Sequence, residues 1–229
     1  GIRDYKVTGV QTCALPIFSV LVVEPERIKL LADKAFRYAE QAACAQGSAL
    51  CDARSADYEE FESAVASVSL SEVPVAYALG VAWVGWIQAN SEDWAAIAEL
   101  GRAKLVMEKV ISLNEAYENG GPHLYMGGME TLLPASLGGK PEKGRAHFEK
   151  ALAINDRYLM TKVIYAEQYA RLTFDQELHD RLLKEVIEAN PETDGMTLTN
   201  RIAQERARDL LAASPRSEEH TSELQSPCN

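Results

Sequence analysis

The chain has 229 residues, of which 23 are basic and 34 are acidic, so its formal net charge at pH 7 is −11. A surface this acidic repels phosphate backbones and anionic lipids, which argues against nucleic-acid binding and against an electrostatic membrane contact. The length suits one domain with a sizeable core. We expect no apolar run that approaches the roughly 20 residues of a membrane-spanning helix.

The two ends of the chain carry peptides that protein physics does not explain. Residues 7–17 read VTGVQTCALPI, and residues 216–226 read RSEEHTSELQS. One codon choice for the first peptide gives the second when it is read from the opposite strand in another frame, so both look like translated sequencing adapter. We therefore expect residues 1–17 and 216–229 to be scars, and residues 18–215 to be one domain that has lost its natural N-terminus. Without the scars, 20 basic and 30 acidic residues remain.

Two cysteines lie outside these scars, Cys44 and Cys51, whereas Cys13 and Cys228 lie within them. The spacing in CAQGSALC is wider than a CxxC redox or zinc pair, and no histidine lies close by to complete a metal site. Two interpretations stay open. The cysteines are small residues near a helix end, or they form a disulfide of the kind found in an oxidising compartment such as a periplasm.

Apolar residues recur at helical spacing from Pro25 to Ala213, and no segment alternates as a strand does, so we predict an all-α fold without a sheet. Pro25 is expected in the first turn of a helix that ends before Gly47. Asp57 caps the next predicted helix, which covers residues 57–68. The third begins at Pro74 and is apolar nearly all round, which predicts burial on most sides.

Six more helices follow, and the first of them begins at Ser91 or Asp93 and ends at Asn114. Glycine, proline and asparagine set the limits of the others. These cover residues 120–134, 141–154, 157–172, 175–190 and about 197–213.

The predicted helices form pairs whose sequence patterns repeat along the chain. Tetratricopeptide repeats place a W-x2-L-G-x2-Y pattern on the first helix of a pair and A-x3-F-x2-A on the second, because small residues let paired helices approach. Leu79, Gly80 and Trp83 fit the first pattern. Residues that fit the second, in three copies, are Ala103, Met107 and Val110; Gly144, Phe148 and Ala151; and His179, Leu183 and Val186. We therefore predict tetratricopeptide-like helical hairpins stacked into an α-solenoid of about nine helices.

Four motifs in order carry a family resemblance: GPHLYMGG, the P-x3-GG loop at residues 134–139, HFxxAL at residues 147–152, and the C-terminal TLTNRIAQERARDLL. With them, residues 18–215 resemble the T component (TatT) family of tripartite ATP-independent periplasmic (TRAP) transporter systems. The resemblance implies a periplasmic lipoprotein, a homotrimer that associates with the substrate-binding P component. It also implies a channel or cleft for a small hydrophobic ligand. The family's lipid-attached N-terminus lies outside this sequence.

Aromatic and thioether side chains on the first helices of the pairs are the candidate ligand residues, because first helices line the concave surface of such repeats. The same side chains could instead pack helix against helix. Gly127 and Gly128 have the same two interpretations. The candidates for the walls of the ligand channel are Trp83, Trp86, Tyr125, Met126, Met129, Tyr165 and Tyr169.

No motif indicates catalysis. His123, His147 and His179 lie on separate predicted helices without a HExxH or GxSxG context, and we interpret each as structural. No phosphate-binding loop is present, and we predict no catalytic residue, metal ligand or cofactor. The sequence thus favours a non-enzymatic, solute-binding component of a TRAP-type uptake system. The alternative is a tetratricopeptide scaffold that binds a partner's peptide and no solute, for which basic and asparagine side chains on the inner helices would be expected.

Overall fold

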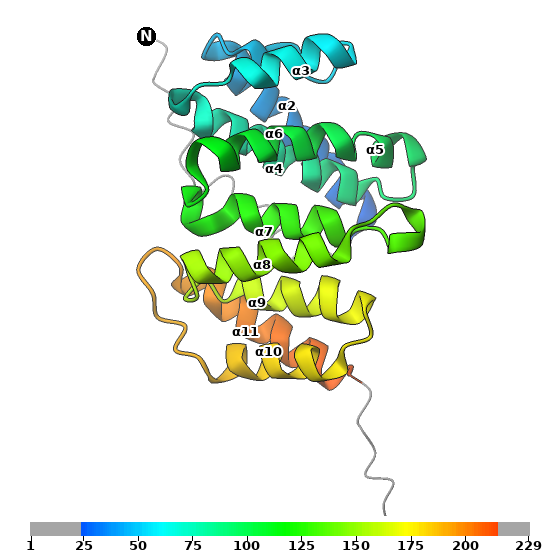
Figure 1. Ribbon diagram of the computed structural model, residues 1–229. Coiled ribbons are helices and arrows are strands. Elements are labelled where there is room, and N and C mark those ends of the chain that lie inside the picture. The colour runs from blue at the N-terminus through cyan, green and yellow to red at the C-terminus, as the bar shows by residue number, and fades with distance from the viewer. Residues whose placement is uncertain (1–23, 215–229) are drawn as a thin grey trace, which may run out of the picture.

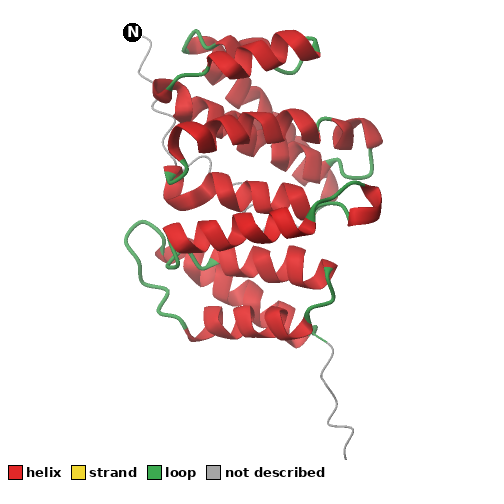
Figure 2. Ribbon diagram, viewed as in Figure 1, coloured by secondary structure: helices red, strands yellow, loops and turns green. Residues whose placement is uncertain are grey.

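The computed structural model describes residues 24–214, and in this range every regular element is a helix. Successive helices run back and forth and stack on one another along the molecule (Figures 1 and 2). The prediction of an all-α fold without a sheet is confirmed for these residues. The expected scars at residues 1–17 and 216–229 lie outside the described range.

The N-terminal part begins with a helix whose first turn contains Pro25, as predicted. The next α-helix is capped by Asp57, whose Oδ1 accepts a hydrogen bond of 2.8 Å from the Glu60 amide. The predicted fourth helix is divided at Glu99, whose side chain accepts hydrogen bonds from Trp83 and from Arg54. The elements are α2 (Pro25–Ala45), the 3₁₀ helix η1 (Ala49–Asp52), α3 (Tyr58–Ser67), the 3₁₀ helix η2 (Leu70–Glu72), α4 (Val73–Ala89), α5 (Trp94–Ala98) and α6 (Leu100–Asn114).

In the C-terminal part, two elements differ from the simple helices predicted. Glu118, Asn119 and Gly120 have φ angles of 47°, 61° and 82°, so regular helix begins only after them. The predicted helix at residues 157–172 begins at Met160 and widens into a π-helix. The elements are α7 (Tyr117–Thr131), the 3₁₀ helix η3 (Ala135–Leu137), α8 (Pro141–Ile154), α9 (Met160–Ile164), the π-helix η4 (Tyr165–Ala170), α10 (Gln176–Glu188) and α11 (Thr197–Ala212).

Helix α4 is the most buried element of the N-terminal part, with 12 of its 17 residues buried. Together with η2 it forms a 20-residue segment, Leu70–Ala89, that is long and apolar enough to cross a membrane. The expectation that no run approaches this length was therefore wrong. Because 67% of the segment's apolar window is buried inside the fold, the segment has the burial of a core helix.

The buried apolar side chains form two clusters, which we call the N-terminal core and the C-terminal core. Residues of α2, α3, α4 and α6 make up most of the first, and residues of α8 to α11 make up most of the second. Helix α7 contributes to both, with Met126 and Met129 in the N-terminal core and Leu124 in the C-terminal core. It is therefore the element that joins them.

Glycines bring α7 and α8 into close contact. A Cβ atom on Gly127 would lie 2.7 Å from the Phe148 ring, and one on Gly144 would lie 3.0 Å from the Gly127 carbonyl oxygen. Of the two interpretations of Gly127, close helix contact is the one that these distances support. The tetratricopeptide-like repeat itself stays a prediction.

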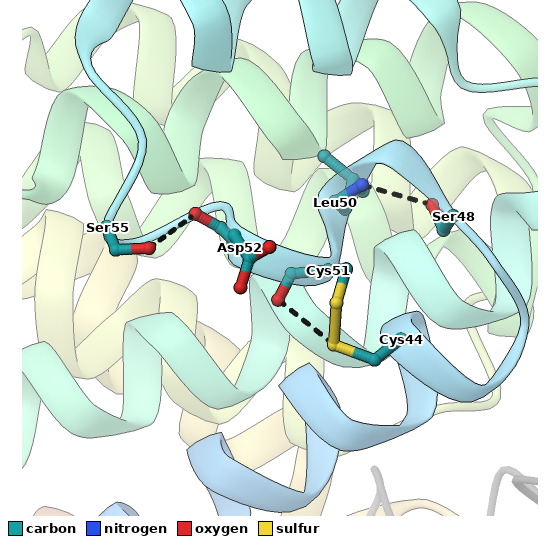
Figure 3. The surroundings of a disulfide bond; sticks show 6 residues. All are labelled: Cys44, Ser48, Leu50, Cys51, Asp52 and Ser55. Carbon is teal, nitrogen blue, oxygen red and sulfur yellow. Dashed lines mark hydrogen bonds between the residues drawn. A yellow bond between two sulfur atoms is a disulfide. The ribbon is translucent and has the colours of Figure 1, made fainter.

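Cys44 and Cys51 form a disulfide, so the second interpretation of this pair holds. The bond links the end of α2 to η1 (Figure 3). In the loop it closes, the Ser48 hydroxyl accepts a hydrogen bond from the Leu50 amide, and the Leu50 side chain is buried in the N-terminal core. The disulfide therefore fixes this end of the N-terminal core. Cys13 and Cys228 lie outside the described residues.

Candidate functional site

The seven predicted ligand residues belong to two groups. The first group lies in or against the N-terminal core and the second lies in the C-terminal core. Trp86 and Tyr125 are half-buried, and the other five are buried. The members of the first group are Trp83, Trp86, Tyr125, Met126 and Met129, and those of the second are Tyr165 and Tyr169.

Trp83 is fully buried and has a structural partner for its polar atom. Its indole Nε1 donates a hydrogen bond of 2.7 Å to Glu99 Oε2. Its ring centroid lies 5.3 Å from that of Phe36 and 5.8 Å from that of Phe61. Packing of this kind stabilises the fold, and it leaves no face of Trp83 exposed to solvent.

Trp86, one helical turn further along α4, is the more accessible of the pair. Its Nε1 donates a hydrogen bond of 2.6 Å to Asp33 Oδ1 on α2. The Arg54 guanidinium lies 3.9 Å from the ring centroid, a cation–π contact. Arg54 also donates from Nε to Glu99 Oε1 at 3.3 Å. The indole is thus held in one orientation by α2 and by the segment after η1, and it combines an apolar ring with charged neighbours.

A carboxyl group near Arg54 is desolvated. Burial raises the pKa of Glu40 above its usual range, and the repulsion from Asp52 and Glu99 acts in the same direction, whereas Arg54 opposes both. Acidic groups therefore dominate the surroundings of this guanidinium.

Tyr125 lies on the face of α7 that packs against α4. Its ring meets Tyr77 edge-on, with 6.0 Å between the centroids, and Tyr77 meets Tyr117 in the same way at 5.2 Å. A Cβ atom on Gly121 would lie only 2.2 Å from the Tyr77 hydroxyl oxygen, so a glycine is needed for these rings to pack. Burial raises the pKa of Tyr117. Met126 and Met129 fill the N-terminal core beneath this row of rings.

Tyr165 and Tyr169 project from the π-helix toward α8. Tyr169 donates its hydroxyl hydrogen to Glu142 Oε1 at 2.9 Å, and Tyr165 donates to Glu149 Oε1 at 3.5 Å. Burial raises the pKa of Tyr165 to about 12, and the negative charge of Glu149 adds to this effect. The Tyr165 ring stacks on Phe148, with the centroids 5.0 Å apart. π-Helices occur often at functional sites, and this one turns two phenols toward a carboxylate-bearing helix.

The structure also brings together two histidines that the sequence interpretation kept apart. His123 Nδ1 on α7 lies 2.9 Å from His147 Nδ1 on α8, and His123 Nε2 lies 3.4 Å from Glu115 Oε2. Burial lowers the pKa of His123 and lowers that of His147 to about 4. His179 instead pairs with Asp180. In the described residues 24–214, no three metal-ligating side chains lie close enough together to hold a metal ion.

No pattern within a single helix indicates this pair. His123 lies eight residues before the end of α7 at Thr131, and His147 lies six residues after the start of α8 at Pro141. The register between the two helices brings the rings together, and the sequence of one helix does not contain that register.

The chain matches a known protein family. The family model described as TRAP transporter T-component matches residues 18–216, which is most of the chain. None of the curated proteins matches the chain.

Proposed function

Since the chain belongs to the TRAP transporter T-component family, we propose that it binds a small hydrophobic organic solute beside Trp86 and passes it to, or holds it for, the P component of the uptake system. Membership of the family suggests a non-enzymatic role in a TRAP system that is periplasmic or membrane-associated. The disulfide between Cys44 and Cys51 agrees with an oxidising compartment.

The observation that carries the proposal is the environment of Trp86. Its large apolar ring is half-buried, with part of its surface exposed, and its orientation is fixed by Asp33 and Arg54. An oriented, partly exposed aromatic ring supplies contact area with little loss of side-chain entropy on binding. Tyr125, also half-buried, is the second accessible member of the predicted set.

Three further parts of the proposal rest on the family resemblance. We propose that the protein acts as a homotrimer, that it contacts the P component, and that a lipid attached to the natural N-terminus anchors it. We also propose that four buried side chains form the inner walls of the ligand channel, namely those of Met126, Met129, Tyr165 and Tyr169.

The test is native mass spectrometry of the purified protein, which retains bound small molecules. Trp86→Ala is expected to reduce the retained solute at least about tenfold, the effect of losing roughly 1.4 kcal/mol of contact. The matched control is Trp94→Ala, because Trp94 is 71% exposed on α5 and is not part of the predicted set. It is expected to retain solute like the unchanged protein.

Two outcomes would count against the proposal. If Trp86→Ala and Tyr125→Ala both fold and retain solute fully, the channel is not at these residues. If no preparation carries a solute but the P component still binds, the scaffold alternative is the better description.

A further inference from the structure

The contact between α7 and α8, where the two cores meet, contains a hydrogen bond between two histidine rings. The Nδ1 atoms of His123 and His147 lie 2.9 Å apart, and His123 has no exposed surface. A hydrogen bond between two ring nitrogens needs one N–H donor and one bare acceptor nitrogen. One of the two Nδ1 atoms must therefore carry no proton for the contact to exist.

Glu115 decides which ring is the acceptor. Its Oε2 lies 3.4 Å from His123 Nε2, and a carboxylate can only accept, so Nε2 of His123 carries the proton. A neutral His123 then has a bare Nδ1, which accepts a hydrogen bond from the Nδ1–H of His147. The free protonation site that remains is Nε2 of His147.

The charges around the pair come from three elements. Lys150 and Lys143 on α8 disfavour protonation of His147, whereas Glu130 on α7 favours it. Glu130 is itself buried and accepts a hydrogen bond of 2.7 Å from Lys104 Nζ on α6. Lys150 also disfavours protonation of His123, and Glu115 favours it.

Protonation of the pair has two steps with different consequences. The first proton can go to His147 Nε2, which keeps the hydrogen bond but places a charge in a desolvated contact. The second must go to His123 Nδ1, the acceptor. Two N–H groups on two cations would then face each other at hydrogen-bonding distance, so the rings must separate.

We propose that the His123–His147 pair is an acid-operated joint, at which α7 and α8 separate locally when both rings take up a proton. The inference does not depend on ligand binding. It makes the connection between the N-terminal core and the C-terminal core sensitive to the pH of the compartment.

The direction follows from proton linkage. In the separated state both rings have the ordinary histidine pKa near 6.5, whereas in the closed state burial holds both values lower. The separated state therefore binds more protons between about pH 6.5 and about pH 4, and the closed state is lost as the pH falls through this range. With two protons taken up, the opening equilibrium rises by up to about a hundredfold per pH unit.

The experiment is hydrogen–deuterium exchange of the whole chain at about pH 7 and about pH 5, corrected for intrinsic exchange rates. We expect amides of α7 and α8 to lose protection at the lower pH while those of α2 and α4 keep theirs. The His147→Gln side-chain amide can still bind His123 but takes up no proton. In this variant the loss of amide protection should be at most about tenfold per pH unit. Glu130→Gln is the control for carboxylate protonation and should keep the full acid response.

The proposal is overturned if His147→Gln responds to acid like the unchanged protein, if Glu130→Gln abolishes the response, or if protection falls evenly over the chain. Should His147→Gln fail to fold, nitrogen NMR of the unchanged protein's imidazoles still decides. At neutral pH it must show one ring protonated at Nδ1 and its neighbour at Nε2. Two rings both protonated at Nε2 would exclude the hydrogen bond on which the joint depends.

Discussion

The N-terminal and C-terminal cores are both built from packed helices, but the polar side chains that contact them are of different kinds. In the N-terminal core, arginines cover the aromatic rings. Arg102 donates to the carbonyl oxygens of Ala53 and Ala56 at 2.9 Å each and lies over the Phe61 ring. In the C-terminal core, a buried amide binds the end of a helix. Gln204 Nε2 lies within 3.1 Å of three carbonyl oxygens at the end of α10.

The difference follows from the composition of the helices. Helix α4 is apolar on nearly every side, so its neighbours need only cover it, and charged groups stay at the rim. Helices α10 and α11 are amphipathic and carry fewer buried apolar residues each. Their packing depends more on satisfied polar contacts. We therefore expect the N-terminal core to be most sensitive to lost volume and the C-terminal core to be most sensitive to lost hydrogen bonds.

The largest effect is expected from Trp83→Ala. Removing a fully buried indole leaves a cavity and takes one hydrogen-bond donor from the Glu99 carboxylate, which costs about 3–5 kcal/mol of unfolding free energy. Urea denaturation followed by circular dichroism measures the loss. Trp94→Ala, at an exposed position, should change stability by less than about 0.5 kcal/mol. Equal effects of the two changes would contradict the N-terminal core as described.

The next effect concerns the disulfide, which is found only at the N-terminal end of the described residues. Changing Cys44 and Cys51 together to serine should cost about 2–3 kcal/mol, the chain-entropy value for so short a closed loop. Urea denaturation measures this loss of unfolding free energy when the variant is compared with the oxidised protein and with the protein under reductant. An unchanged midpoint in both would mean that the bond adds nothing to the stability of this core.

In the C-terminal core, Gln204→Ala should cost about 2 kcal/mol, because three carbonyl oxygens at the end of α10 lose their donor and that of Val186 lies in a buried contact. The control is Glu205→Ala at the next, exposed position of α11. If both variants unfold at the same urea concentration as the unchanged protein, this core does not depend on its buried amide.

The smallest effect on stability tests how the cores are connected. Gly127→Ala places a Cβ atom 2.7 Å from the Phe148 ring and should cost about 1–2 kcal/mol. All three tryptophans lie in the N-terminal part, so their fluorescence follows that part alone, whereas circular dichroism follows every helix. We expect the two transitions to coincide in the unchanged protein and to separate in this variant.

Gly101→Ala is the matched control for that variant. A Cβ atom there meets no other atom within 4 Å, so the change should stabilise α6 by about 0.5–1 kcal/mol. Its two transitions should still coincide. Separated transitions in Gly101→Ala would show that any change at a helical glycine uncouples the probes, and that the α7–α8 contact is not special.

Local sequence signals predicted most of the helices. Two helices begin at the prolines Pro25 and Pro141, and Asp57 caps a third, as expected from the preferences of these residue types. The divided helix at Glu99 and the π-helix were not predictable in this way, because both depend on contacts with other elements. Glu99, for example, is held by Trp83 and Arg54.

The candidate site was less predictable than the fold. Residue type identified Trp86 as a large aromatic on an inner helix, but its partners Asp33 and Arg54 come from other segments. The same limit hid the histidine pair. A pattern within one helix shows which face is apolar, whereas a contact between helices depends on their register.

The sharing of α7 by both cores has a consequence for the order in which the chain can fold. Met126 and Met129 complete the N-terminal core, so that core cannot close until the chain as far as residue 129 takes part in folding. Once in place, α7 exposes the face that receives α8, the next α-helix along the chain. The second core can thus be assembled on a surface that the first has already formed, from the N-terminal side toward the C-terminal side.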